Sequence, residues 1–253
     1  MIGIILKTAK FTFIWGVGYR YAEMLQSNGI KTALDLTRAD DAWVQKRMTI
    51  KGLRTVKELR GEPCIPFELA PPPKKAIMSS RGFGIETGKK DDLKEALADY
   101  TDRAAFKLRR QKSLCSVIQV FIQTSMFKTS GRYSGGISVR LPVPSSDTGV
   151  LTQAAYQGLE RVFKPGYAYR KAGVMLTGII PESAYQPDLF GTSLSSEKKL
   201  NLLKAMDILN ARFGRKAAQM AAAGTTKLWG MRRSKLTPRY TTAWEDLPVA
   251  KAC

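Results

Sequence analysis

The sequence of 253 residues contains no histidine and only three cysteines, Cys64, Cys115 and Cys253. Without histidine, the chain cannot form a Ser-His-Asp or Cys-His catalytic site, a histidine-ligated zinc site or a histidine proton shuttle. Because the cysteines are scattered and form no Cys-x-x-Cys pair, we expect neither a disulfide framework nor a thiolate zinc site. This cysteine usage is typical of a reducing compartment.

Long hydrophobic runs are also absent. The apolar opening, residues 1–6, ends at Lys7, and no later run reaches the about 18 apolar residues that a membrane-spanning helix needs. The opening also lacks the layout of a signal peptide. We therefore expect a cytoplasmic protein with no membrane partner.

Acidic residues are few, with 21 Asp and Glu against 41 Lys and Arg, which gives a net charge of +20. The excess is largest in residues 71–180, which carry 18 basic and 8 acidic residues. Such a charge predicts an anionic partner, and on charge alone both nucleic acid and an anionic membrane surface are open. The 44% hydrophobic content is that of a globular chain, and the length allows two domains.

A proline-rich spacer, Pro-Pro-Pro-Lys-Lys at residues 71–75, predicts a domain boundary, because consecutive prolines favour an extended conformation. Residues 14–70 before it have the pattern of short helices. Strands and helices alternate over residues 76–181, and a partly helical tail follows over residues 182–253.

The helical block contains a Gly-x-Gly turn, Gly16-Val17-Gly18, that leads into a predicted helix near Tyr21. Such a turn can bring backbone N–H groups close to a phosphate, because no side chain blocks the approach. We interpret it as part of a helix-hairpin-helix that binds the DNA backbone; the alternative is a tight turn between two helices. Three further helices are expected: one capped by Thr32, one opened by Asp40-Asp41 and one over residues 51–60.

The middle block has the order β-α-β-β-α-β, which predicts an α+β fold with a four-stranded sheet and two helices on one face. In the second strand, Ile118, Val120, Ile122 and Met126 share the predicted inward face. Expected strands cover residues 76–86, 115–127, 136–143 and 174–179, and expected helices cover residues 91–112 and 151–162.

The opposite face of this sheet should be open, and Ser138 and Arg140 in the third strand should point to it. A basic open face suits a nucleic-acid backbone. The alternative is an ordinary solvated sheet face.

Several segments resemble Y-family translesion DNA polymerases, and their order resembles the UmuC branch of that family. Three resemble the thumb, two resemble the little-finger domain, and one resembles the tail of the UmuC branch. In chain order they are residues 15–18, 29–36, 54–64, 79–84, 169–175 and 239–242. The resemblance covers residues 14–248 and leaves residues 1–13 unmatched.

The resemblance implies that the thumb hairpin and the little finger hold primer–template DNA. The implied contacts in the thumb are Gly16, Val17, Gly18 and Arg20. Those in the little finger are Ser80, Arg81, Thr124 and Arg140, with Phe83 packing inside. Two positions depart from the family pattern, because Tyr19 and Gln123 stand where the family usually has basic residues.

A further motif, residues 184–190, resembles the peptide with which bacterial polymerases bind the sliding clamp. Leu189 and Phe190 would enter an apolar pocket of the clamp, with Asp188 beside them, and Gln186 would hydrogen-bond at the rim. The alternative is a surface loop that packs on its own domain.

The tail is expected to contain a helix over residues 198–213, with Leu200, Leu203 and Leu209 on one stripe and Gly214 as its stop. Residues 227–242 are basic and include Trp229. This stretch can be read as a nucleic-acid contact, as a solvated edge or as a docking surface for accessory proteins of SOS mutagenesis. Its other basic residues are Arg232, Arg233, Lys235 and Arg239.

In the family, palm carboxylates hold the Mg²⁺ ions that catalyse polymerisation. No acid precedes Trp15, and the pairs Asp40-Asp41 and Asp91-Asp92 look like helix starts. We therefore expect no catalytic residues, no metal ligands and no cofactor on this chain. The resemblance implies a nucleoid-associated module that binds primer–template DNA and the clamp. Alternatives are one piece of an active polymerase whose palm is on a separate chain, or an inert gene remnant.

Overall fold

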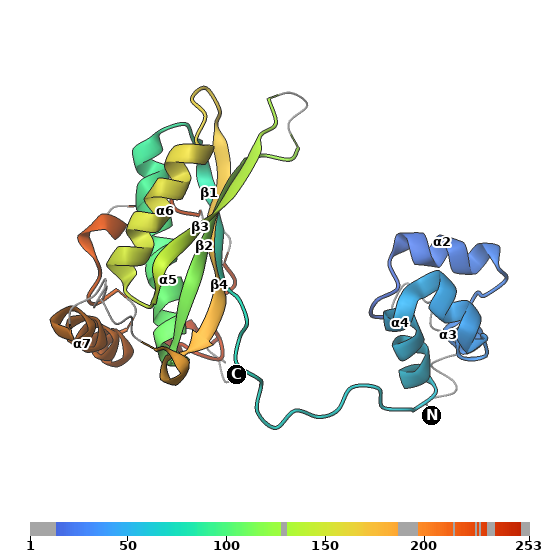
Figure 1. The fold of residues 1–253 in the computed structure, drawn as a ribbon. Helices are drawn as coiled ribbons and strands as arrows, with labels where there is room; N and C mark the ends of the chain where they lie inside the picture. The colour runs from blue at the N-terminus through green and yellow to red at the C-terminus, as the bar shows by residue number, and fades with distance from the viewer. Residues whose placement is uncertain are drawn as a thin grey trace, which may run out of the picture. The chain divides into compact units, whose positions relative to one another are not determined.

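The computed structural model describes residues 14–127, 131–186, 197–214, 216–225, 227, 229–231 and 236–248. The chain divides into two compact units, Met1–Pro72 and Pro73–Cys253, and the division falls within the proline-rich spacer. The two units are therefore described separately (Figure 1).

The first unit contains three helices, α2 (Tyr19–Ser27), α3 (Ala33–Thr37) and α4 (Asp41–Leu59). The caps follow from the sequence: Thr32 and Asp35 form a capping box at α3, and the Asp40 carboxylate accepts the Trp43 N–H at α4. The expected third and fourth helices are joined in α4, and the non-helical backbone of Thr49 separates them.

A small apolar core and one arginine hold these helices together. Leu25, Leu36 and Val44 are fully buried in this core. At the end of α4, the Arg60 guanidinium donates to the carbonyl oxygens of Thr37 and Ala39, each at 2.7 Å. Arg60 thus joins the end of α4 to the end of α3.

The second unit is built on a four-stranded antiparallel sheet in the order β1-β4-β2-β3. Helices α5 and α6 cover one face (Figure 1). The predicted α+β class and the β-α-β-β-α-β order are confirmed. The elements are β1 (Ile77–Thr87), α5 (Lys90–Arg110), β2 (Ser113–Thr124), β3 (Ser134–Ser145), α6 (Thr148–Val162) and β4 (Tyr169–Pro181).

Each helix links two strands that run in the same direction with a third strand between them. α5 connects β1 to β2 around β4, and α6 connects β3 to β4 around β2. The two crossovers therefore interlock, and β2 and β4 form the centre of the sheet. As a result, the outer faces of β2 and β4 become the middle of the uncovered surface.

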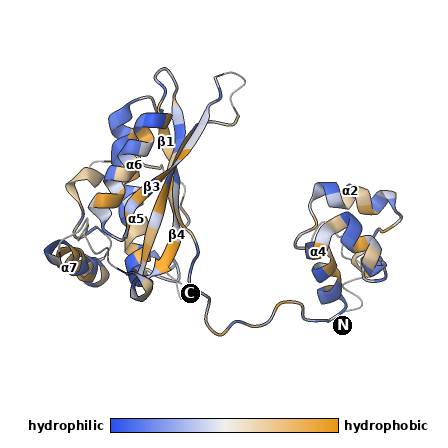
Figure 2. Cartoon of the chain, in the orientation of Figure 1, coloured by the Kyte–Doolittle hydropathy of each residue, from blue (hydrophilic) through white to orange (hydrophobic). Residues whose placement is uncertain are grey.

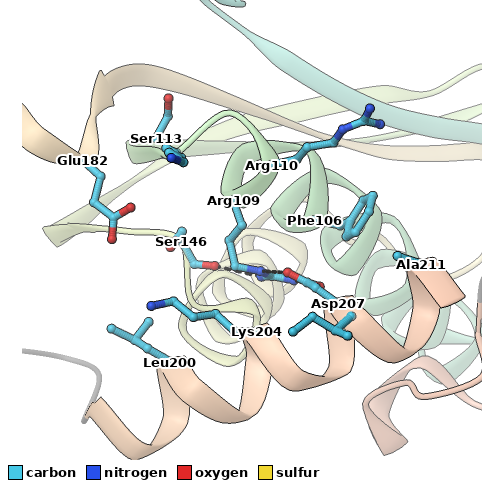
Figure 3. A pocket seen from close by; sticks show the side chains of 12 residues that line it. Phe106, Arg109, Arg110, Ser113, Ser146, Glu182, Leu200, Lys204, Asp207 and Ala211 are labelled. Carbon is cyan, nitrogen blue, oxygen red and sulfur yellow. Dashed lines mark hydrogen bonds and ion pairs between the residues drawn. The ribbon is translucent and has the colours of Figure 1, made fainter.

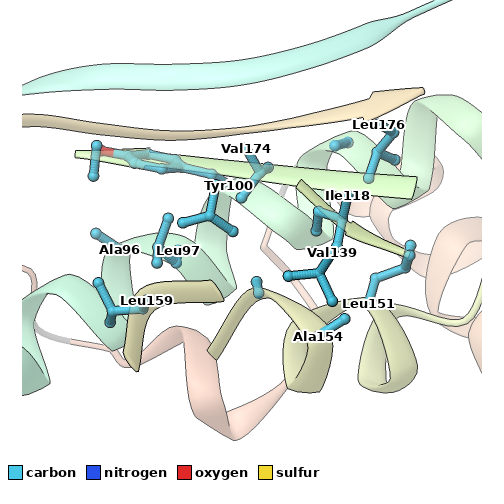
Figure 4. Close-up of a cluster of buried hydrophobic side chains, with 14 of the residues drawn as sticks. Ala96, Leu97, Tyr100, Ile118, Val139, Leu151, Ala154, Leu159, Val174 and Leu176 are labelled. Carbon is cyan, nitrogen blue, oxygen red and sulfur yellow. The ribbon is translucent and has the colours of Figure 1, made fainter. Parts of the chain in front are cut away.

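The core of the second unit lies between the sheet and the two helices. Figure 4 shows Leu97 and Tyr100 of α5 and Leu159 of α6 beneath strand residues such as Val174 and Leu176. The residues of β2 alternate as predicted, with Ile118, Val120 and Ile122 fully buried. Figure 2 shows the colour changing between hydrophobic and hydrophilic residues along the strands.

One predicted core position is wrong. Met126 was expected to share the inward face of β2, but β2 ends at Thr124 and the Met126 side chain is 73% exposed in the following turn. The ladder with β4 stops at the pair Thr124–Tyr169, so no neighbouring strand remains beyond this point.

After β4 the chain forms η2 (Glu182–Ala184), α7 (Glu197–Phe213), η3 (Ala221–Ala223) and η4 (Trp244–Asp246). The expected α7 helix is present, and Gly214 follows it with φ +93°. The predicted stripe is only partly correct, because Leu203 is buried while Leu209 is largely exposed. In the ranges that the structure describes, no helix is long and apolar enough to cross a membrane.

Candidate nucleic-acid interface

In the first unit, the Gly-x-Gly turn presents backbone at the start of α2. Gly16 has φ +91°, which favours glycine, and Gly18 is the N-cap of α2 without a side-chain cap. The Val17 side chain is buried in the helical core, and its N–H donates to the Ile14 carbonyl at 3.1 Å. Val17 thus anchors the turn. The first N–H groups of α2 have no acceptor within the helix and can donate to an anion.

The side chains around this turn point into solvent. Arg20 is exposed on the first turn of α2, and Trp15 and Tyr19 are both largely exposed on either side of the glycines. A cation and the start of a helix therefore lie within the same short segment. Both favour a negatively charged ligand.

In the second unit, cross-strand pairing defines four rows of residues on the uncovered face of the sheet. Residues that pair directly share a face, so the register assigns each side chain. In the order β1, β4, β2, β3 the rows are Met78, Met175, Gln119, Ser138; Ser80, Gly173, Phe121, Gly136; Gly82, Lys171, Gln123, Ser134; and, without a β1 residue, Thr177, Val117, Arg140. These rows contain no acidic residue, so their charge comes from Lys171 and Arg140.

The four predicted little-finger contacts are not brought together. Ser80 and Arg140 lie on the uncovered face. Arg81 pairs with Ala172, which is fully buried, so Arg81 lies on the helix-covered side of the edge strand β1. From this side of the sheet Arg81 acts on Tyr100 of α5. Burial, followed by the Asp99 charge, raises the pKa of Tyr100, and the positive charges of Arg103 and Arg81 oppose this rise.

Thr124 is placed as a structural residue at the end of β2. Its side chain is buried, and its hydroxyl accepts the Tyr133 N–H at 2.9 Å and donates to the Tyr133 carbonyl at 3.3 Å. Both hydrogen-bonding roles of the hydroxyl are used in closing the hairpin between β2 and β3.

Comparison with known proteins gives two domain matches, and both lie in the second unit. Residues 74–189 match the C-terminal domain of the impB/mucB/samB family, and residues 201–250 match DUF4113, a domain of unknown function. The chain is 39% identical to Protein ImpB of Salmonella typhimurium over 94% of its length, and 37% identical to Protein UmuC of the same species over 92%. Residues 74–189 are thus an impB/mucB/samB family C-terminal domain.

The family match covers only part of each relative. The chain spans 56% of the length of Protein ImpB and of Protein UmuC, and corresponds to their C-terminal part. It is also 26% identical, over 84% of its length, to DNA polymerase IV of Desulfatibacillum aliphaticivorans, of which it spans 52%. The resemblance to Y-family polymerases of the UmuC branch is confirmed.

The DUF4113 stretch, residues 201–250, packs against the helix-covered side of the second unit. Arg109 of α5 binds Asp207 of α7 through two hydrogen bonds of 2.7 and 2.8 Å. The same guanidinium donates to the Ser146 carbonyl at 3.0 Å (Figure 3). It also donates to the Thr148 hydroxyl at 2.9 Å. Arg109 thus joins α5, α6 and α7 beside a groove of about 1030 Å³.

Further along, the tail enters the core. The Trp229 side chain is 5% exposed, and its carbonyl accepts the Gly84 N–H of β1 at 3.1 Å. The interpretation of Trp229 as an aromatic contact for nucleic acid is therefore wrong, because its ring is buried in the protein core. Arg239 pairs with Asp246 at 3.2 Å. Arg232, Arg233 and Lys235 lie outside the described residues.

Only part of the predicted clamp motif can be placed. Gln186 is exposed directly after η2. Asp188, Leu189 and Phe190 lie outside the described residues.

The described residues contain no group of three or more His, Cys, Asp or Glu side chains that could hold a metal ion. The acid pairs are used at helix starts: Asp40 caps α4, and Asp91 and Asp92 lie in the first turn of α5.

The sequence interpretation missed Phe121 on the uncovered face. The signal was available, because residue 121 alternates with the inward positions 120 and 122 in the same way as Gln119 and Gln123. An aromatic residue at an outward position of a central strand is a better indicator of a binding surface than a polar one, because solvent alone does not favour it.

Proposed function

We propose that this chain is the DNA-binding and clamp-binding part of an error-prone translesion polymerase that acts in SOS mutagenesis at the nucleoid. The main support is the uncovered sheet face, which carries Lys171 and Arg140 and no acidic residue in its four rows. The impB/mucB/samB C-terminal domain at residues 74–189 and the net charge of +20 favour DNA over another anionic partner.

In this proposal the first unit holds the DNA backbone at the Gly16–Gly18 turn, where the first N–H groups of α2 donate hydrogen bonds to a phosphate oxygen. The second unit places its sheet along the DNA and contributes Arg140, Lys171 and Ser80. Contacts of this kind position the protein and carry no sequence information. Arg81, on the helix-covered side of β1, and Thr124, whose side chain is buried, are not included among these contacts.

The DNA-binding part of the proposal is tested by fluorescence anisotropy with a labelled primer–template. We expect binding that weakens steeply with salt, because Lys and Arg release counterions from the phosphates. Affinity that does not change with salt, or absence of binding at low salt, contradicts it.

The clamp-binding part rests on the sequence of residues 184–190 and on the exposure of Gln186. The double variant Leu189→Ala/Phe190→Ala should lose retention on immobilised sliding clamp while primer–template affinity stays the same. Retention of this variant at the wild-type level contradicts the clamp assignment.

A second candidate is that the chain is one piece of an active polymerase, with the palm supplied by another chain. The observation that favours it is the 56% coverage of the relatives. Primer extension with Mg²⁺ and nucleotides separates the two. We expect no incorporation by the chain alone, whereas activity that appears on mixing with a palm-containing chain supports the second candidate.

A third candidate, an inert remnant, is disfavoured by the continuous core of the second unit. A cooperative unfolding transition of the purified chain is the expected result. A broad, non-cooperative transition would support the remnant instead.

A further inference from the structure

Phe121 lies at the centre of the uncovered sheet face with a glycine on each side. It pairs with Gly173 on β4 and with Gly136 on β3, and Ser80 on β1 pairs with Gly173 from the other side. The row across the sheet is therefore Ser80, Gly173, Phe121, Gly136. No side chain of β3 or β4 rises beside the aromatic ring in this row.

The ring lies across the sheet toward β1, over Gly173. A Cβ atom at residue 173 would lie 2.5 Å from Cζ and 2.9 Å from Cε1 of Phe121, and 2.3 Å from the Cβ of Ser80. Distances this short are not tolerated, so the missing side chain of Gly173 provides the space for the ring. The ring is consequently held by the backbone beneath it.

A cation lies over this ring. Lys171 is in the adjacent row, opposite Gln123, and its Nζ makes a cation–π contact 6.0 Å from the Phe121 ring centroid. Among the residues that the structure describes, Lys171 has no carboxylate partner. An aromatic ring held on a sheet, with a flexible lysine that contacts it and has no carboxylate partner, matches the chemistry of a nucleotide: a flat base linked to a phosphate.

We propose that Phe121 is a stacking platform for an unpaired base of single-stranded DNA, and that Lys171 binds the neighbouring phosphate. In a duplex the base faces are covered by adjacent base pairs, so the ring has no partner there. This inference rests on the proposed DNA-binding function and deepens it, because it adds a site for the unpaired template strand.

The test uses the full chain and two labelled probes, a thymidine oligonucleotide of about 12 nucleotides and a blunt duplex of the same length. The variants Phe121→Ala and Phe121→Leu should each lower affinity for the single strand about tenfold, because each removes one stacked base contact. Affinity for the duplex should stay unchanged. Phe121→Leu keeps an apolar side chain over Gly173, so it separates loss of stacking from loss of folding.

Lys171→Ala should act differently, since it removes a phosphate contact. We expect weaker binding of both probes and a salt slope on the single strand that is lower by about 0.7. Phe127→Ala is the matched control: Phe127 is 96% exposed, lies in the turn after β2 and is outside the four rows, so neither affinity should change.

Two outcomes overturn the platform. One is an unchanged single-strand affinity in folded Phe121→Leu, and the other is an equal loss for single strand and duplex. Failure of the proposed function looks different, because the unmodified chain would then bind neither probe at low salt.

Discussion

The Trp229 indole meets the Tyr100 ring edge-on, with the ring centroids 5.9 Å apart and the planes at 80°. The same indole meets Phe83 of β1 at 5.7 Å and 68°. Tyr100 is in the middle of α5, so a residue of the DUF4113 stretch completes the core between β1 and α5. The DUF4113 stretch therefore belongs structurally to the second unit.

Trp229→Ala should lower the free energy of unfolding by about 3–5 kcal/mol, because it removes a large buried ring and leaves a cavity between Phe83 and Tyr100. Urea denaturation of the full chain measures this change. Trp244→Ala is the matched control: Trp244 is 87% exposed, so the loss should be under about 0.5 kcal/mol. Equal effects of the two variants would show that the indole of Trp229 is not part of the core.

A buried carboxylate joins the same segments. Asp99 is 3% exposed, and three cations surround it: Arg103 at 2.6 Å, Lys216 at 3.5 Å and Lys227. Asp99→Asn should destabilise the second unit by about 1–3 kcal/mol, because Lys227 would be left half-buried without a counter-charge. The urea midpoint measures this change. Lys216→Ala, which removes only the most exposed of the three cations, should cost much less.

Some features of this fold are determined by residues that are close together in the sequence. The alternation in β2, the acidic start and basic end of α5, and the caps at Thr32 and Asp40 all depend on neighbours within a few residues. These features were predicted correctly. The position of Trp229 depends on a backbone hydrogen bond to Gly84 and on two rings far away in the sequence, and no local pattern records such contacts.

Faces of edge strands were also difficult to predict. Ser80 and Arg81 are adjacent, so they must point to opposite sides of β1, and only the pairing with β4 shows which of them meets solvent on the uncovered face.

Thr124→Val distinguishes a structural role for this residue from a contact with DNA. The substitution removes the two hydroxyl hydrogen bonds to Tyr133 and keeps the backbone one, so the free energy of unfolding should fall by about 1–3 kcal/mol. Primer–template affinity of the folded variant should stay the same. A loss of affinity without a loss of stability would instead place the hydroxyl at the DNA.

Alkaline pH should destabilise the second unit through Cys115. Burial raises the pKa of this thiol from 9.0 to about 12. Between these values the unfolded chain loses the proton while the folded chain keeps it, so stability falls as pH rises through this window. Cys115→Ala should therefore show a shallower decline in urea midpoint between about pH 8.5 and 10.5. Identical slopes for the two proteins would contradict the assignment.

Arg140 and Arg161 offer a matched test of which side of the second unit meets DNA. Both are exposed, but Arg140 lies on the uncovered sheet face and Arg161 lies in the last turn of α6, on the helix layer. Each alanine variant removes one positive charge, so the net charge of the chain changes equally. If the sheet contacts the backbone, Arg140→Ala should reduce the salt slope for duplex DNA by about 0.9, whereas Arg161→Ala should leave it unchanged. The slope is measured by anisotropy titrations at several salt concentrations. Only a direct phosphate contact alters the number of counterions released, so a larger effect of Arg161→Ala would place the DNA interface on the helices.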